Sequence, residues 1–204
     1  MFKINTKSIN GGENMNTHNE FTSNCEPSAV ALGYFDGIHR GHQKVISKAV
    51  SLKKYGLKPT VFTFSQNPKS VISGTPENRI TNNKEKETEI QKLGIEELYI
   101  VNFENIKNMT SIEFVEDLLY KKLNAHAVVC GFNYHFGKGG HSNAEDLKKI
   151  CKNYNIKTYI IKPVLYKSKP ISSTRIREAL KQNDVSKVTD MMKGENLKYN
   201  KFSA

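Results

Sequence analysis

Short apolar runs recur along the chain and are separated by longer, more polar segments. The runs are rich in Val, Ile, Tyr and Phe, and their lengths suit strands that are buried on both faces of a sheet. Five runs fit this description: Ala29–Gly33, Pro59–Phe64, Leu98–Val101, Ala127–Gly131 and Thr158–Ile161. We therefore predict a sheet of about five strands.

The segments between the runs have helical character. Four helices are predicted at His42–Tyr55, Asn83–Leu93, Ile112–Leu123 and Ala144–Tyr154. In the first, Val45, Ala49 and Leu52 share one face. The third begins with a capping box, because Thr110 is followed three residues later by Glu113. Its predicted apolar face consists of Ile112, Val115, Leu119 and Leu123.

The order of strands and helices indicates the fold class. Strand and helix alternate in units of about 30 residues, which is typical of a parallel sheet wound on both faces. We expect an α/β, Rossmann-like domain, followed by two short helices at Ser173–Gln182 and Val185–Met192. The predicted boundaries are a polar, Asn-rich extension at 1–24, one domain at 25–197 and a tail at 198–204.

Composition limits the class of protein. A chain of 204 residues with 37% hydrophobic and 25% charged residues suits one folded core. No apolar stretch approaches the roughly 20 residues of a membrane helix, so we expect a cytoplasmic protein with no membrane partner. Cys25, Cys130 and Cys151 show no disulfide or zinc-site spacing and are expected to be reduced thiols.

The net charge is +11 and favours an anionic partner. However, the lysines are spread along helical segments rather than gathered in one block. Lys84 and Lys86, for example, alternate with Glu85, Glu87 and Glu89. We interpret these lysines as solvated helix surface and predict no nucleic-acid partner.

In a sheet of this kind, ligands bind beyond the carboxyl ends of the strands. The first segment there runs Gly33-Tyr-Phe-Asp-Gly-Ile-His-Arg-Gly-His42. Gly33, Gly37 and Gly41 let backbone or ligand approach closely, and His39 and His42 face the same way at a helix start. The pattern predicts a phosphate site, suited to in-line displacement at an α-phosphate whose oxygens need fixed donors.

Two further interpretations concern the same segment. Asp36 is expected to cap the helix and organise the loop rather than act as an acid or base. A zinc site formed by Asp36, His39 and His42 is conceivable but poor, because the spacing supplies no convincing set of three ligands.

The late segment Ile171-Ser-Ser-Thr-Arg-Ile-Arg177 opens a helix after Pro170. Alone it predicts an ordinary capped helix, but together with the histidines it predicts a triphosphate clamp. Ser173 or Thr174 and Arg177 would then hold the departing phosphates. Because Arg175 and Arg177 are two residues apart, we expect only one of them to reach these phosphates.

Four segments in this order and spacing resemble the FAD synthetase module of prokaryotic bifunctional riboflavin kinase/FMN adenylyltransferases. They are Gly33–Gln43, Thr63–Pro68, Gly131–Gly140 and Ile171–Leu180. The first and last are similar to motifs of the wider nucleotidyltransferase superfamily. The loop Gly131-Phe-Asn-Tyr-His-Phe-Gly-Lys138 resembles that of the flavin branch.

The resemblance implies that ATP and FMN are converted to FAD and pyrophosphate with Mg²⁺. It implies catalytic roles for His39, His42, Asn133 and Arg177, with Asn133 near the metal. Further ligand contacts are implied for Gly33, Phe35, Asp36, Gly37, Gly41, Phe64, Asn67, Pro68, Gly131, Ser173 and Thr174. The flavin would lie beside Phe64, Asn67 and Pro68. The loop after Gly131 also contains three aromatic residues that could contact the flavin or pack in the interior: Phe132, Tyr134 and Phe136.

The chain departs from the family pattern in two ways. Ser65 stands where many relatives have Asp and Asn67 where they have His, so the resemblance supports no metal or proton role there. Relatives also continue into a riboflavin kinase module, so we expect adenylyl transfer without riboflavin phosphorylation and a separate riboflavin kinase as the source of FMN.

Two alternatives stay open: a nucleotidyltransferase acting on nicotinamide mononucleotide or phosphopantetheine, and a relative that binds nucleotide or nucleic acid without turnover. The oligomeric state is not predicted.

Overall fold

The core of the protein is a six-stranded, wholly parallel sheet with the strand order β1-β4-β3-β2-β5-β8. The computed structural model describes residues 15–20, 26–76 and 78–193. The strands of the sheet are β1 (Asn16–His18), β2 (Ser28–Leu32), β3 (Lys58–Phe64), β4 (Glu97–Val101), β5 (Ala125–Gly131) and β8 (Lys157–Ile161). Two antiparallel ribbons accompany the sheet: β6 (His135–Phe136) with β7 (Ser142–Asn143), and β9 (Leu165–Tyr166) with β10 (Lys169–Pro170).

Helices cover both faces of the sheet, because successive residues of each central strand point to opposite sides. Ala29 and Ala31 of β2 face one core, with α1 (Arg40–Val50), its 3₁₀ continuation η1 (Ser51–Tyr55) and α3 (Asn83–Lys92). Val30 and Leu32 face the other core, with η3 (Phe114–Lys122), which continues the short helix α4 (Ser111–Glu113), and with α5 (Ala144–Lys152). The predicted doubly wound, Rossmann-like fold is therefore confirmed.

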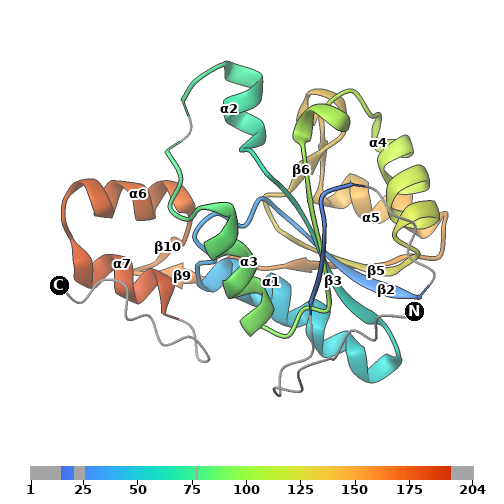
Figure 1. Ribbon diagram of the computed structural model, residues 1–204, viewed down its shortest axis with the longest axis horizontal. Helices are drawn as coiled ribbons and strands as arrows, with labels where there is room; N and C mark the ends of the chain where they lie inside the picture. Colours follow the sequence, from blue (N-terminus) through green and yellow to red (C-terminus); the bar gives the residue numbers. More distant parts are fainter. Residues whose placement is uncertain (1–14, 21–25, 77, 194–204) are drawn as a thin grey trace, which may run out of the picture.

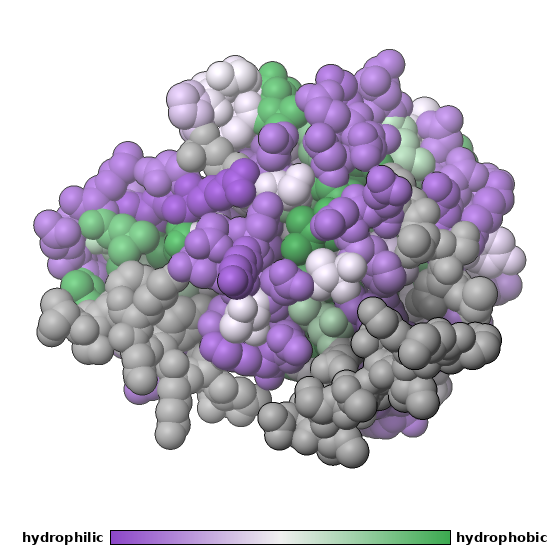
Figure 2. Space-filling model, viewed as in Figure 1, coloured by the Kyte–Doolittle hydropathy of each residue, from purple (hydrophilic) through white to green (hydrophobic). Residues whose placement is uncertain are grey.

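The chain beyond the sheet forms a small helical extension. The helices α6 (Ser173–Lys181) and α7 (Val185–Met192) lie together at one end of the molecule in Figure 1. A third apolar cluster that includes Ile176, Val188 and Met191 holds them together. The remaining short helices are α2 (Pro68–Ser73), η2 (Phe103–Asn105) and η4 (Lys138–Gly140). The surface shown in Figure 2 is largely hydrophilic, as the spread of charged residues predicted.

Strand β1 was not expected, because it lies within the segment predicted to be a polar extension. Its attachment is polar: Asn16 Nδ2 donates to Glu97 Oε1 at 3.0 Å, and His18 Nε2 lies 2.6 Å from Glu97 Oε2. The His18 ring also stacks on Tyr99 with centroids 4.6 Å apart. An apolar pattern could not have predicted this strand. Cys25 and the predicted tail 198–204 lie outside the described residues.

The helix predicted at Ile112–Leu123 is present, but its winding differs from the prediction. The capping box of Thr110 and Glu113 is confirmed. From Phe114 on, the helix is a π-helix, whose i→i+5 hydrogen bonds change which residues share a face. Of the predicted apolar face, Val115, Leu119 and Leu123 are buried, whereas Ile112 is 58% exposed. Phe114, which was not part of the predicted face, is buried as well.

Three further structural observations bear on the sequence predictions. Cys130 and Cys151 are buried free thiols, and burial raises their pKa values to about 12 and about 11. Within the described residues, no helix is long and apolar enough to cross a membrane. Lys86, interpreted as solvated, is instead only 1% exposed.

Candidate active site

A cavity of about 600 Å³ opens at the carboxyl ends of β2, β3 and β5, against the start of α6. This is where a parallel sheet binds its ligands. The structure brings most of the predicted site residues together here. Those lining the cavity are Gly33, Phe35, His39, Gly41, His42, Phe64, Asn67, Pro68, Gly131, Asn133, Ser173, Thr174 and Arg177. Of the predicted residues, all within the described part of the chain, Asp36 and Gly37 alone do not line it.

The loop between β2 and α1, residues Gly33–His39, has an unusual backbone. Phe35, Gly37 and Ile38 all have positive φ angles, of 54°, 81° and 43°. Glycine tolerates this region, but a buried aromatic and a β-branched residue do not adopt it without strain. The surrounding structure must therefore hold the loop in place.

Side chains from several other elements and loops hold this β2–α1 loop. Three of its carbonyl groups accept hydrogen bonds: Tyr34 O from Thr63 Oγ1 at 2.9 Å, Asp36 O from Ser173 Oγ at 3.0 Å, and Ile38 O from Gln43 Nε2 at 2.8 Å. The N–H of Gly37 donates to Thr81 Oγ1 at 3.1 Å. Such a network fixes a strained loop before any ligand binds.

The two histidines stack at the start of α1, with ring centroids 3.6 Å apart and planes inclined by 17°. His39 is the N-cap, and its Nδ1 accepts a hydrogen bond from the backbone N–H of His42 at 3.3 Å. The expectation that Asp36 caps this helix is therefore wrong. His39 lies next to the first helical residue, whereas the carboxylate of Asp36 is directed to other donors.

The histidines are neutral at physiological pH. Burial lowers the pKa of His39 to about 4. The pKa of His42 is held well below its usual value, chiefly by burial and further by His39 and Lys86. Since His39 Nδ1 accepts a hydrogen bond, its proton resides on Nε2. His42 lines the cavity, and its buried Nδ1 has no hydrogen-bond partner among the described residues. The pair thus offers ring N–H donors rather than two positive charges.

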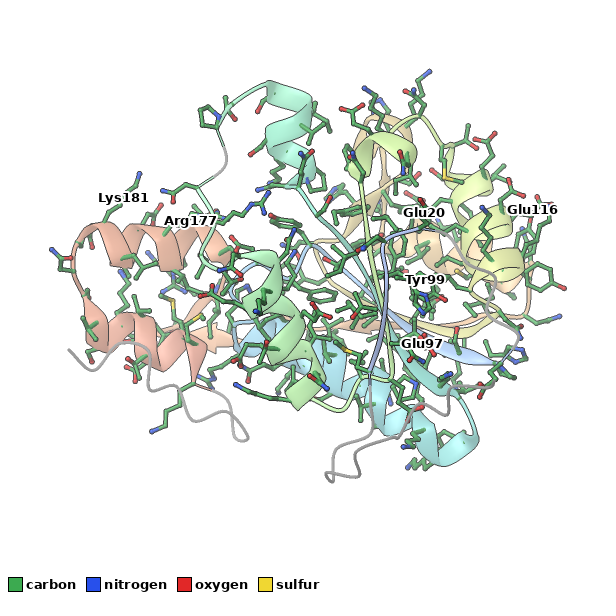
Figure 3. All side chains as sticks on the ribbon, in the orientation of Figure 1. Glu20, Glu97, Tyr99, Glu116, Arg177 and Lys181 are labelled. Carbon is green, nitrogen blue, oxygen red and sulfur yellow. The ribbon has the colours of Figure 1, made fainter. Side chains whose placement is uncertain are left out.

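Asp36 and Arg177 join the β2–α1 loop to α6. Asp36 is 1% exposed; its Oδ1 accepts from the backbone N–H groups of Ile80 and Thr81 at 3.0 and 3.2 Å. Its Oδ2 pairs with Arg177 Nη2 at 2.5 Å. Arg177 extends from α6 toward the segment between α2 and α3, where its Nε donates to Asn78 O (Figure 3). Asp36 therefore organises the loop, as predicted, and orients Arg177.

Arg175 points away from the cavity. Its guanidinium donates to the carbonyl groups of Tyr166, Lys169 and Pro170, at distances of 3.3, 2.8 and 2.7 Å. It thus fastens the β9–β10 ribbon to α6. Of the two arginines only Arg177 lines the cavity, as the spacing of the two residues indicated.

The loop after β5 forms another wall. Tyr134 N donates to Gly131 O at 3.1 Å, which makes a turn that carries Asn133. Tyr134 and Phe136 stack with centroids 5.9 Å apart and pack against the core, so packing is their main role. Phe132 is 47% exposed and lines the cavity, which makes it the aromatic residue of this loop best placed for a ligand.

The end of β3 forms the opposite wall. Asn67 caps α2, because its Oδ1 accepts from Lys69 N at 3.0 Å, and Pro68 occupies the first turn. Ser65, where relatives were expected to have Asp, bonds to Val101 O through its backbone N–H at 2.9 Å. The hydroxyl group of Ser65 also donates to Val101 O, at 3.4 Å, so the side chains of Ser65 and Asn67 both make local structural hydrogen bonds.

Comparison with known proteins identifies the family. A model of the FAD synthetase family matches residues 21–175. The chain belongs to this family. The bifunctional riboflavin kinase/FMN adenylyltransferase of Bacillus subtilis is 35% identical over 162 residues, covering 78% of this chain and 51% of that protein.

Two other proteins are similar to this chain over most of its length. A FAD synthetase of Listeria monocytogenes is 30% identical over 168 residues, covering 81% of this chain and 68% of the relative. The crystal structure of a macrolide-efflux protein from Streptococcus pneumoniae superimposes with a TM-score of 0.73 at 32% identity, covering 87% of this chain and 59% of that one. The chain spans about half the length of most of the curated relatives it matches.

A metal site in this FAD synthetase domain would be incomplete without substrate. The described residues contain no group of three His, Cys, Asp or Glu side chains that could hold a metal ion, and none of those lining the cavity is Asp or Glu. Asn133 supplies an amide oxygen, a ligand type that Mg²⁺ accepts. Mg²⁺ commonly completes its coordination with ligand phosphates and water, so these residues would fit an ion held mainly by a bound phosphate ligand.

Several residues that support the site were missed by the sequence analysis. Lys86, Gln43, Thr63 and Thr81 hold the β2–α1 loop from positions up to 52 residues away. One signal for Lys86 was present, since it lies four residues before the buried Ile90 and therefore on the same face of α3.

Replacing Gly41 with alanine is expected to lower turnover about tenfold. An added Cβ would lie 3.1 Å from His39 Cε1 and 3.2 Å from Nδ1, which is closer than these atoms ordinarily approach. The His39 ring would shift from its stacked position on His42 while the helix stays formed. Steady-state kinetics with a circular dichroism control tests this; an unchanged kcat in a folded protein would contradict it.

Acidification is expected to destabilise the fold. In the unfolded chain His39 titrates near 6.5, but in the folded chain it titrates near 4. Between these values the unfolded state binds more protons, so stability falls as pH decreases from about 6.5 to 4, by about 1.4 kcal/mol per unit of pKa difference. Urea unfolding across this range measures the effect. His39→Asn should flatten the dependence, and an equally steep dependence in that variant would contradict the assignment.

Proposed function

We propose that this chain is an FMN adenylyltransferase, which transfers AMP from ATP to the phosphate of FMN to give FAD and pyrophosphate. The observation that carries the proposal is the stacked, neutral pair His39 and His42 at the N-terminus of α1, facing a cavity shared with Arg177. The family and the names of the relatives support this reaction rather than transfer to another acceptor.

In the proposed reaction, a phosphate oxygen of FMN attacks the α-phosphorus of ATP. The new P–O bond forms as the bond to the bridging oxygen of the β-phosphate breaks, and pyrophosphate leaves with that oxygen. Charge builds up on the α-phosphate oxygens in the transition state. His39 and His42 would donate N–H bonds to these oxygens, and the free amides of the helix terminus would add to them. No covalent enzyme intermediate is needed.

The start of α6 would bind the departing phosphates. Ser173 and Thr174 present hydroxyl groups, and Arg177 presents a guanidinium whose position is set by Asp36. An arginine fork suits phosphate oxygens, and its charge would stabilise pyrophosphate as it leaves. Gly33 gives room to the Phe35 ring and Gly131 to the side chain of Asn133, because an added Cβ would lie 2.9 Å and 3.3 Å from them.

Asn133 is proposed to face the reacting phosphates from the loop after β5, with its amide oxygen available to Mg²⁺. The ion, when bound, would supply positive charge that neutralises part of the negative charge on the phosphates. The isoalloxazine ring is proposed to lie beside Phe64, Pro68 and the exposed Phe132. These apolar side chains suit a flat aromatic ligand.

The reaction is tested by incubating the purified chain with ATP, Mg²⁺ and, separately, FMN, riboflavin, nicotinamide mononucleotide or phosphopantetheine, followed by chromatography of the products. We expect FAD and pyrophosphate from FMN and no product from the other acceptors. Product from nicotinamide mononucleotide or phosphopantetheine would favour a different nucleotidyltransferase. No product from any acceptor, together with salt-sensitive nucleic-acid binding, would favour a binding protein.

Several finer expectations remain predictions. They are the separate riboflavin kinase that supplies FMN, the absence of a nucleic-acid partner, the cytoplasmic location and the domain boundaries at residues 25 and 197.

Omitting Mg²⁺ or adding a chelator to the same assay is expected to abolish FAD formation.

A further inference from the structure

Lys86 on α3 lies in the interior, although charged residues of a surface helix normally reach solvent. Its exposed fraction is 1%, whereas Lys84, two residues earlier on the same helix, is exposed. Burying an ammonium group is costly unless dipoles or charges replace the lost water. The partners of Lys86 therefore indicate why it lies there.

The Lys86 ammonium joins two walls of the cavity. Its Nζ donates to Tyr34 O at 3.1 Å and to Phe64 O at 3.0 Å, and lies 4.2 Å from the centroid of the Tyr34 ring. Tyr34 belongs to the β2–α1 loop and Phe64 ends the neighbouring strand β3. Both residues line the cavity, whereas Lys86 itself does not.

Neighbouring side chains strengthen this junction. Thr63 Oγ1 donates to the same carbonyl of Tyr34, and Asn83 Nδ2 donates to Ser65 O at 3.3 Å. Asn83 and Lys86 are three residues apart, so they lie on one face of α3 and reach consecutive carbonyl groups at the end of β3. The helix thus fixes the carboxyl end of β3 relative to the β2–α1 loop.

We propose that Lys86 is a positioning residue for adenylyl transfer. By binding the carbonyl groups of Tyr34 and Phe64, it sets the distance between the histidine pair and the side of the cavity formed by β3. The reaction named here rests on the proposed function, but the junction between the two walls does not.

The charge of Lys86 has a second consequence. The charged and titratable groups that act on His42 are His39 and Lys86, and both oppose its protonation. Together with burial, they hold the pKa of His42 well below its usual value. Removing the ammonium is therefore expected to raise the pKa of His42.

The kinetic test compares Lys86→Met, which removes the charge but retains a long apolar side chain, with Lys84→Met on the exposed side of α3. We expect kcat for FAD formation to fall about tenfold or more in Lys86→Met, with KM for ATP changed less than about threefold. The acidic limb of the pH–rate profile should move to higher pH. Lys84→Met should match the unsubstituted protein, and Lys86→Arg should recover part of the lost kcat.

A second measurement does not depend on turnover. NMR titration of the His42 ring, assigned from the resonance absent in His42→Asn, should give a higher pKa in Lys86→Met than in the unsubstituted protein. If the unsubstituted protein makes no FAD, the proposed function fails, while this titration still tests the effect of Lys86. The proposal is overturned if the pKa of His42 is the same in both proteins and kcat falls only in proportion to the fraction of folded protein. Lys86 would then have a purely structural role.

If Lys86→Met does not fold, Lys86→Arg and Lys86→Gln replace it, because one keeps the charge and the other retains only a neutral donor. A higher kcat and a lower His42 pKa in the arginine variant support the proposal. Equal values in the two variants overturn it.

Discussion

Replacing His42 with alanine is expected to lower kcat for FAD formation by about two to three orders of magnitude, with KM for FMN nearly unchanged. His42 lines the cavity, its ring is neutral, and its buried Nδ1 finds no partner within the described residues. A neutral ring N–H held in this way suits the charge that develops on the α-phosphate. The flavin is proposed to bind elsewhere in the cavity, so ground-state binding of FMN should survive.

Lys44→Ala on the same helix is the matched control, since Lys44 is exposed and should retain full kcat. The His42→Ala protein must also bind FMN in a fluorescence titration, so that a loss of turnover is separated from unfolding. A kcat within about threefold of the unsubstituted protein would remove His42 from its proposed role.

The sequence predicted those parts of the fold that depend on apolar patterning. Strands β2 to β5 are apolar runs largely buried on both faces, β8 is a partly buried run at the edge of the sheet, and the positions of all five agree with the prediction. Strand β1 was missed because Asn16, Thr17 and His18 are polar and the strand depends on Glu97, about 80 residues later. The π-winding after Phe114 was also missed, since no local signal distinguishes it from an α-helix that begins with the same capping box.

In the site too, only some of the residues could be predicted from the sequence. His39 and His42 could be predicted from spacing, because the residues that make the motif are adjacent in sequence. The side chains that hold the β2–α1 loop could not, since Thr81 and Ser173 lie 44 and 137 residues from their partners Gly37 and Asp36. Lys86 was assigned to the surface from its alternation with glutamates, and only its packing shows otherwise.

Asp36→Ala is expected to destabilise the fold by about 3–5 kcal/mol and to abolish most adenylyl transfer. The substitution leaves the buried N–H groups of Ile80 and Thr81 without their acceptor and Arg177 without its carboxylate. It also releases a loop in which Phe35 and Ile38 hold strained positive φ angles. Relaxation of that loop would move His39, so turnover should fall even in protein that remains folded.

Urea unfolding and FAD formation measured on the same preparations test both parts of this prediction. Asp36→Asn is the graded control: it keeps an oxygen that can accept from Ile80 and Thr81 but loses the charge that pairs with Arg177. Its loss of stability should be smaller. A double-mutant cycle with Arg177→Gln should give a favourable coupling energy of about 1 kcal/mol or more, because the two side chains form one partly buried ion pair. Additive losses would mean that Asp36 acts through the backbone alone, and that Arg177 is positioned by Asn78 instead.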